Sequence, residues 1–184
     1  MLFNLFGSKE DKSDRIFKDV VWIDTAAKNN ALVNLYRQQP NTLFVAWFPD
    51  AAKQLRDFLQ AQGIDADCVV EAKTLSSHKA EAHTLVFIEH YPLHQKEIDL
   101  AEELHLTKVD VYGALDEAIF VYFGSEKMLP LVKMLGFKAT ESIQHPYVTS
   151  SVIKAQEKMA AKVTVEQSAR SIADWLAKNL PPRD

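Results

Sequence analysis

Two near-continuous apolar runs limit most strongly what this chain can fold into. They cover residues 42–48 and 84–88, and the first is rich in aromatic side chains. A short apolar run without polar alternation is typical of a strand that is covered on both faces, as in a parallel sheet. Further apolar segments at 17–23, 66–71 and 108–112 predict three more strands.

Helical segments separate these predicted strands. Asp24 is a candidate N-cap for a helix over 25–39, and Pro49 begins a helix that Gly63 ends. Shorter helical patterns cover 76–82 and 93–105. This alternation predicts an α/β fold, a three-layer sandwich with a mainly parallel sheet.

The segment 114–159 predicts three short helices. Glu117 lies at the start of the first and Gly124 ends it, while Gly136 ends the second. The joint His145-Pro146 is expected to be extended, because proline disfavours helical geometry in the residue before it. The third helix is expected to begin near residue 149 or 150. The apolar positions that predict the second helix are Met128, Leu129, Val132 and Leu135.

The order of motifs in this segment resembles a known family. An acidic segment ends in Phe123-Gly124, and Leu135-Gly136, a 143–146 motif (Ile-Gln-His-Pro) and a 155–158 motif (Ala-Gln-Glu-Lys) follow. This order is similar to the end of the second nucleotide-binding domain of SecA, the motor ATPase of bacterial preprotein translocation. The resemblance covers most of 17–160, most weakly in the middle. It implies a RecA-like, helicase-type second lobe with C-terminal helices and a link to translocation.

The residues that ATP chemistry needs are missing from the sequence. A P-loop requires a glycine-rich turn followed by lysine, and none of the five glycines precedes a lysine. No arginine lies between Arg56 and Arg170 to stabilise a transferring phosphoryl group, and the first nucleotide-binding lobe of the motor is not expected within 184 residues. We therefore expect a non-catalytic relative without a cofactor, acting through protein contacts.

Candidate ligand-binding residues follow the two central strands. Ligands of open parallel sheets lie beyond the carboxyl ends of the strands. This edge predicts either a pocket for a peptide or small molecule or an ordinary rim of loops. The alternative function is a hydrolase or metal-dependent enzyme around 89–94. The candidates are Trp47, Phe48, Asp50, Glu89, His90, Tyr91 and His94.

Four histidines are candidate metal ligands. His90 and His94 are four residues apart, but Pro92 lies between them and interrupts a shared helix. The chain has one cysteine, Cys68, so it offers neither an internal disulfide nor a Cys-x-x-Cys motif. Solvated or capping histidines are expected, with no metal site, and the same applies to His78 and His83.

Charge and hydropathy limit the partners. A net charge of −4 with five arginines argues against nucleic acid, which attracts clustered lysine and arginine. No run reaches the roughly 18 apolar residues that span a bilayer, so a cytoplasmic protein is expected. Residues 1–7 are apolar but short, and the acidic residues that follow argue against membrane contact.

The predicted organisation has three parts: a flexible segment over 1–14, an α/β domain over 15–124, and a helical extension over 125–184 packing on that domain. Two helices are expected in the tail, over 150–163 and 165–180, the second beginning at a capping box over 164–167. Their apolar faces either pack on the chain's own sheet or dock a protein partner or a second copy.

Overall fold

A five-stranded, all-parallel sheet forms the centre of the computed structural model, which describes residues 16–125, 130, 134, 136, 138 and 140–181. The strand order is β1-β5-β4-β2-β3. The predicted α/β class is therefore confirmed. The strands are β1 (Phe17–Trp22), β2 (Thr42–Ala46), β3 (Val69–Glu71), β4 (Thr84–Phe87) and β5 (Val109–Ala114).

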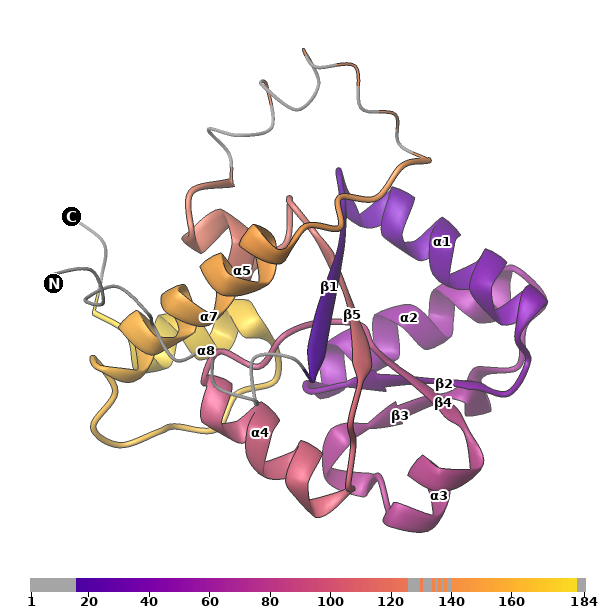
Figure 1. Cartoon of the computed structure of the whole chain (residues 1–184), viewed down its shortest axis with the longest axis horizontal. Coiled ribbons are helices and arrows are strands. Elements are labelled where there is room, and N and C mark those ends of the chain that lie inside the picture. Colours follow the sequence, from indigo (N-terminus) through magenta and orange to yellow (C-terminus); the bar gives the residue numbers. More distant parts are fainter. Residues whose placement is uncertain are drawn as a thin grey trace, which may run out of the picture.

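Helices cover both faces of this sheet (Figure 1). Neighbouring residues of each central strand point to opposite faces. Phe44 packs with α1 (Thr25–Gln38) and α2 (Pro49–Ala61), whereas Val45 packs in a second core with α3 (Ser77–Ala82) and α4 (His94–Glu103). Short 3-10 turns, η2 (Ala66–Cys68) and η3 (Ala72–Thr74), flank β3.

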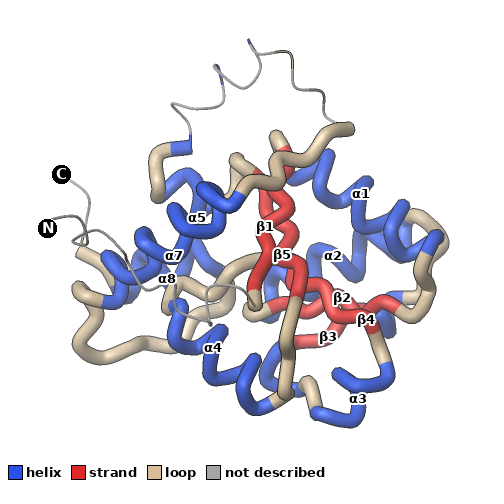
Figure 2. Tube along the Cα trace, in the orientation of Figure 1, coloured by secondary structure: helices blue, strands red, loops and turns tan. Residues whose placement is uncertain are grey.

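The remaining helices gather at one end of the sheet (Figure 2). They are α5 (Ala118–Tyr122), α7 (Pro146–Ala160) and α8 (Ile172–Asn179). A third core joins Met159 and Trp175 of this group to Val21 of β1 and Ile119 of α5. Segment 140–145 also touches the edge of the sheet, since Val21 and Ile143 form an isolated antiparallel bridge. The C-terminal helices thus share a core with the α/β part, while the predicted boundary at 124/125 remains a prediction.

Local signals placed the first helices well. The Asp24 side chain accepts a 2.8 Å hydrogen bond from the Ala27 amide, as an N-cap does. Gly63 and Gly124 follow the ends of α2 and α5 with φ of +71° and +87°, a region that glycine enters at little cost.

The C-terminal helices begin elsewhere than predicted. His145 is extended, as expected, but it is itself the N-cap of α7 and Pro146 is its first residue, so the helix starts before residue 149. The predicted helix start at a capping box over 164–167 is wrong. Helix α8 begins after Ser171, whose hydroxyl accepts from the Asp174 amide at 3.1 Å, while 163–171 is irregular.

Some predictions concern residues outside the described part of the chain. They are the flexible segment 1–14 and the helix assigned from Met128, Leu129, Val132 and Leu135. Within the described residues, no helix combines the length and hydropathy needed to cross a bilayer.

Candidate functional site

The strand order places a topological switch point between the carboxyl ends of β2 and β4, and we call this position the crevice. The chain leaves β2 through α2 toward β3, and it leaves β4 through α4 toward β5 on the other side. Such a divergence is where open parallel sheets bind ligands. Trp47 and Phe48 follow β2, and Glu89, His90 and Tyr91 come soon after β4. The structure therefore brings these predicted residues together at one edge.

Glu89 connects the ends of the two strands. Its Oε1 accepts hydrogen bonds from the backbone amides of Trp47 at 2.9 Å and Phe48 at 3.0 Å. The side chain is buried, and burial raises the pKa of Glu89 to about 8 although the two amides oppose the shift. Glu89 thus links the segments that follow β2 and β4 within the crevice.

Aromatic rings fill the space above this connection. The ring of Tyr91 stacks on Phe48 with centroids 5.5 Å apart and planes within 10°. Trp47 approaches the same ring at 5.2 Å, and Trp175 of α8 at 6.4 Å. The Tyr91 hydroxyl donates to Glu166, which also accepts from Trp175 Nε1. The C-terminal segment therefore covers the crevice with its own side chains.

A buried ionic cluster lies beside this aromatic group. His90 is 3% exposed, and its ring nitrogens contact two carboxylates: Nε2 lies 2.7 Å from Asp19 Oδ1, and Nδ1 lies 2.9 Å from Glu97 Oε1. Asp19 comes from β1 and Glu97 from α4. The expectation of a solvated or capping histidine is therefore wrong for His90. Its ring links the edge strand to a helix packed on that face.

Glu97 is the centre of the cluster. Besides the contact with His90, its Oε1 accepts from the Tyr91 amide at 2.8 Å. Its Oε2 lies 3.1 Å from His94 Nδ1 and accepts from Gln156 Nε2 at 3.0 Å. The same Gln156 nitrogen donates to the Tyr91 carbonyl at 2.7 Å. Gln156 belongs to α7, so the cluster also fixes a C-terminal helix.

The electrostatics of the cluster favour a charged histidine between two carboxylates. Burial alone lowers the pKa of His90, but Glu97 and Asp19 outweigh it and hold that pKa well above its usual value. Burial likewise raises the pKa of Glu97, but His90, with His94 and Gln156, lowers it to about 2. Because both ring nitrogens donate to carboxylates, His90 keeps no free lone pair with which to accept a proton from a substrate.

A second buried charge lies on the other side of Glu89. The ammonium of Lys28, on α1, donates to the Ile88 carbonyl at 2.8 Å and forms an ion pair with Glu117. Glu117 is the N-cap residue of α5, and its other oxygen accepts from the Ala114 amide at 3.0 Å. The charge of Lys28 is thus neutralised within the protein.

The last two candidates lie at the margin of the crevice. Asp50, in the first turn of α2, pairs with Arg170 at 2.8 Å. His94 begins α4, and its Nε2 is buried without a partner. Although His90 and His94 both contact Glu97, the described residues contain no group of three or more His, Cys, Asp or Glu side chains arranged to hold a metal ion.

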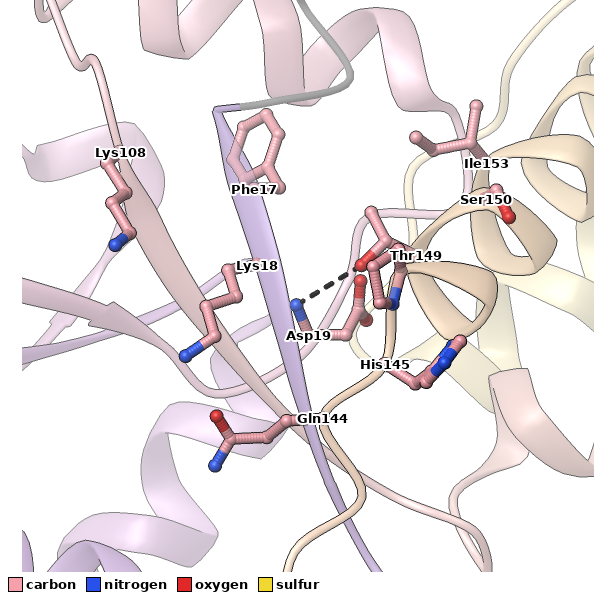
Figure 3. A pocket seen from close by; sticks show the side chains of 10 residues that line it. Phe17, Lys18, Asp19, Lys108, Gln144, His145, Thr149, Ser150 and Ile153 are labelled. Atoms are coloured by element: carbon pink, nitrogen blue, oxygen red, sulfur yellow. Dashed lines mark hydrogen bonds between the residues drawn. The ribbon is translucent and has the colours of Figure 1, made fainter.

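An open groove of about 530 Å³ runs along the outside of the cluster (Figure 3). It lies between β1 and the start of α7, with Asp19 and Thr149 in its wall and Lys18 and Lys108 at its rim. The Asp19 amide donates a long, 3.4 Å hydrogen bond to the Thr149 hydroxyl, and Asp19 Oδ2 is buried without a partner. Through Asp19 the buried cluster comes close to the surface.

Sequence reasoning missed Asp19, Glu97, Lys28 and Gln156 as members of this site. Asp19 interrupts the apolar residues of a predicted strand, and a carboxylate in a buried strand requires a partner. Glu97 is followed by three further acidic residues, Asp99, Glu102 and Glu103, so its sequence context does not distinguish it from them. Gln156 lies on the apolar face of its helix, and a polar side chain at such a position likewise requires a buried partner.

Comparison with known proteins gives a local similarity. No protein-family model matches the chain. It is 35% identical over 48 residues, or 26% of its length, to the protein translocase subunit SecA of Buchnera aphidicola subsp. Cinara cedri. Over 51 residues, or 28% of its length, it is 39% identical to SecA of Acidithiobacillus ferrooxidans and 37% identical to SecA of Pelagibacter ubique. The matches span about 6% of each relative. They support a SecA-related region within this chain.

Proposed function

We propose that this chain is a non-catalytic relative of the second nucleotide-binding domain of SecA, acting through protein contacts linked to preprotein translocation. The observation that carries the proposal is the filled crevice. Tyr91 occupies the space where an open parallel sheet accepts a ligand, and Trp175 and Gln156 cover it from the C-terminal helices.

The charges around the crevice also disfavour a nucleotide. A triphosphate needs cations or free backbone amides to neutralise its oxygens. The nearby ammonium of Lys28 is already paired with Glu117, and the amides of Trp47 and Phe48 donate to Glu89. The cluster of Asp19, His90 and Glu97 adds two carboxylates against one imidazolium. A polyphosphate placed there would meet net negative charge.

The link to translocation is supported by the local similarity to proteins named protein translocase subunit SecA. Because the chain spans about 6% of the length of these relatives, their activity as whole proteins is not assigned to it. Contact with other proteins does not require a bound nucleotide, so it is compatible with a filled ligand site. Contact with translocase components is therefore the role that we propose.

Exposed apolar side chains in the C-terminal part favour this region as the contact surface. Tyr147, in the first turn of α7, is 77% exposed, and Val165, in the irregular segment before α8, is 81% exposed. His145 stacks on Tyr147 with centroids 5.0 Å apart, which holds the exposed ring in one orientation. Pre-ordered aromatic side chains are common anchors of protein interfaces.

A hydrolase acting through Glu89 is the second candidate. The raised pKa of this carboxyl, at the carboxyl end of a strand, is a property of general acids. Assays with p-nitrophenyl acetate and p-nitrophenyl phosphate, with and without zinc, test it. A turnover that disappears in Glu89→Gln while the variant remains folded would favour the hydrolase over the protein-contact function.

Co-purification from the native cell tests the proposed function. The tagged chain is crosslinked in the cell, purified, and the captured proteins are identified by mass spectrometry. We expect translocase components to be enriched, and the double variant Tyr147→Ser, Val165→Ser to lose them. Lys53→Ser on the exposed face of α2 is the matched control and should retain them. Absence of every translocase component from the wild-type sample contradicts the proposal.

A further inference from the structure

A second groove, of about 450 Å³, lies between α1 and the ends of β1 and β5, and we call it the α1 groove. Its aromatic side is formed by Trp22, at the end of β1, and Tyr112 of β5. The helix contributes three side-chain amides, Asn30, Asn34 and Gln38. The groove thus combines flat apolar rings with uncharged groups that form hydrogen bonds.

The two rings form one aromatic surface. The centroids of Trp22 and Tyr112 lie 6.2 Å apart, and their planes are inclined by 48°. A planar base inserted between two parallel rings needs a separation of about 7 Å, twice the ~3.5 Å of a van der Waals contact. The rings therefore leave no slot for a base. A pyranose ring instead packs its C–H face against one side of an aromatic ring, and these half-buried rings offer it such a surface.

The three amides are free to bind a ligand. Asn30, Asn34 and Gln38 are exposed, and their side chains make no hydrogen bond to another described residue. Each amide offers two donors and one acceptor. A sugar hydroxyl both donates and accepts, so one amide can bond two adjacent hydroxyls of a sugar at the same time.

The amides recur along one face of the helix. Residues four apart are separated by about 6 Å along a helix axis, which is close to the length of one sugar unit in a glycan chain. The row from Asn30 to Gln38 therefore extends about 12 Å. This length matches a segment of about two to three linked sugars, with the hydroxyls of each sugar beside one amide.

The remaining polar groups of the groove favour a neutral ligand. Asp24 gives Oδ1 to the Ala27 amide, and its other oxygen has no hydrogen-bond partner among the described residues. The hydroxyls of Tyr112 and Thr140 make no hydrogen bond to another described residue either. A carboxylate oxygen accepts from a sugar hydroxyl but repels an anionic group. No lysine or arginine lines the groove, so phosphate or sulfate groups would find nothing to neutralise them.

We infer that the α1 groove binds a neutral oligosaccharide segment, with sugar faces on Trp22 and Tyr112 and sugar hydroxyls on the amides of α1. This inference goes beyond the proposed function and is independent of it. The groove shares no lining residue with the aromatic group around Tyr91 or with the exposed contact surface at Tyr147 and Val165.

Proton–nitrogen correlation NMR of the full chain tests the inference. The chain has three tryptophans, and the variant Trp22→Phe identifies the indole signal of Trp22. Trp22 Nε1 is buried without a hydrogen-bond partner among the described residues, so its proton is sensitive to a ligand packed on the ring. The probes are maltotriose, cellotriose, mannotriose and triacetylchitotriose. We expect at least one of them to shift the Trp22 signal saturably while the signals of Trp47 and Trp175 stay in place. If none of the four shifts it at tens of millimolar, the inference is wrong.

A triple variant tests the role of the amides. Asn30→Ala, Asn34→Ala, Gln38→Ala should bind the same trisaccharide at least tenfold more weakly. Alanine is a better helix former than asparagine or glutamine, so the variant should fold at least as well as the wild type. The control, Gln54→Ala with Gln60→Ala on the exposed face of α2, should bind as the wild type does. Equal binding by the triple variant would overturn the inference.

Competition tests the class of ligand. Adenosine and an end-capped octapeptide of alternating leucine and serine are added to the complex of the chain with its trisaccharide. We expect the Trp22 signal to remain at its shifted position, because neither competitor presents adjacent hydroxyls to all three amides of α1. Displacement of the trisaccharide by either competitor would contradict the assignment to oligosaccharides.

Discussion

Replacing Glu97 by glutamine should destabilise the fold more than any other single charge removal in the buried cluster. The carboxylate contacts both histidine rings, the Tyr91 amide and the Gln156 amide, all between 2.8 and 3.1 Å. Glutamine keeps the shape, but it presents an NH₂ group where one oxygen accepts hydrogen bonds. It also leaves the His90 imidazolium with one carboxylate instead of two.

The magnitude follows from the electrostatics of the cluster. The pKa of Glu97 falls from 4.5 to about 2 in the folded protein. Because one pKa unit corresponds to about 1.4 kcal/mol, ionised Glu97 contributes about 3 kcal/mol to the free energy of unfolding. Removing one partner of a buried pair costs about 3–5 kcal/mol in other proteins, in agreement with this value. A loss of this size is a large fraction of the roughly 5–15 kcal/mol typical of a domain.

Urea unfolding followed by circular dichroism at pH 6 measures this loss. The matched control is Glu102→Gln, an exposed carboxylate on the same helix, for which we expect a change below about 0.5 kcal/mol. A lowered carboxyl pKa gives stability that is present above the unfolded value of 4.5 and lost as pH falls toward 2. The variant should therefore lose less stability than the wild type over this range. The reasoning would be refuted if the variant lost less than about 1 kcal/mol of unfolding free energy at pH 6 and destabilised as much as the wild type when the pH falls from 4.5 toward 2.

Three further perturbations test other parts of the fold. Gln156→Leu leaves the Tyr91 carbonyl without its donor and removes one of the two partners of Glu97 Oε2, so it should lower the free energy of unfolding by about 1–3 kcal/mol, with faster amide exchange in α7. Glu89→Gln should flatten the pH dependence of urea unfolding. A carboxyl whose pKa is raised to about 8 in the folded protein gives stability that is lost as pH rises from 4.5. The free energy of unfolding of the variant, relative to that of the wild type, should therefore be higher at pH 8.5 than at pH 5. Gly113→Ala brings a Cβ within 2.6 Å of the Phe120 ring and should cost about 1–3 kcal/mol in thermal unfolding, whereas the double variant with Phe120→Leu should recover part of the loss.

The sheet could be predicted from the sequence because its signals are local. The run at 42–48 is apolar from Leu43 onward, and β2 is buried on both faces. Asp24 caps the first helix through an amide three residues away. Each of these features depends on neighbours in the chain, and hydrophobic periodicity and capping chemistry report such neighbours directly.

The C-terminal helix starts could not be predicted in the same way. The sequence at 164–167 fits a capping box, in which Thr164 and Gln167 would bond each other's backbone amides. In the structure the Gln167 amide donates to Asn179 Oδ1 at 2.6 Å, and its side chain donates to the Lys178 carbonyl at 3.3 Å. The groups of Gln167 that the box needs are therefore engaged by the end of α8. The cap that forms, Ser171 to Asp174, has the same local chemistry seven residues later.

The sequence predicts which candidate residues follow the two central strands, but the contacts of these residues are long-range. Asp19 and His90 are 71 residues apart, and Gln156 lies 59 residues from Glu97. The hydrophobic pattern predicts that a strand ends near Glu89, but it does not predict that α7 and α8 pack over the strand ends. The sequence therefore indicates where a ligand crevice belongs, and only the structure reveals that the chain fills it.

Isothermal titration calorimetry with ATP and with ADP, each in the presence of magnesium, tests the central claim most directly. The claim is that Tyr91, Trp175 and Gln156 occupy the crevice and that Lys28, the buried cation beside it, is already paired with Glu117. We expect no binding heat with either nucleotide up to millimolar concentration. Stoichiometric binding of ATP, or hydrolysis in proportion to the concentration of the purified chain, would contradict the account.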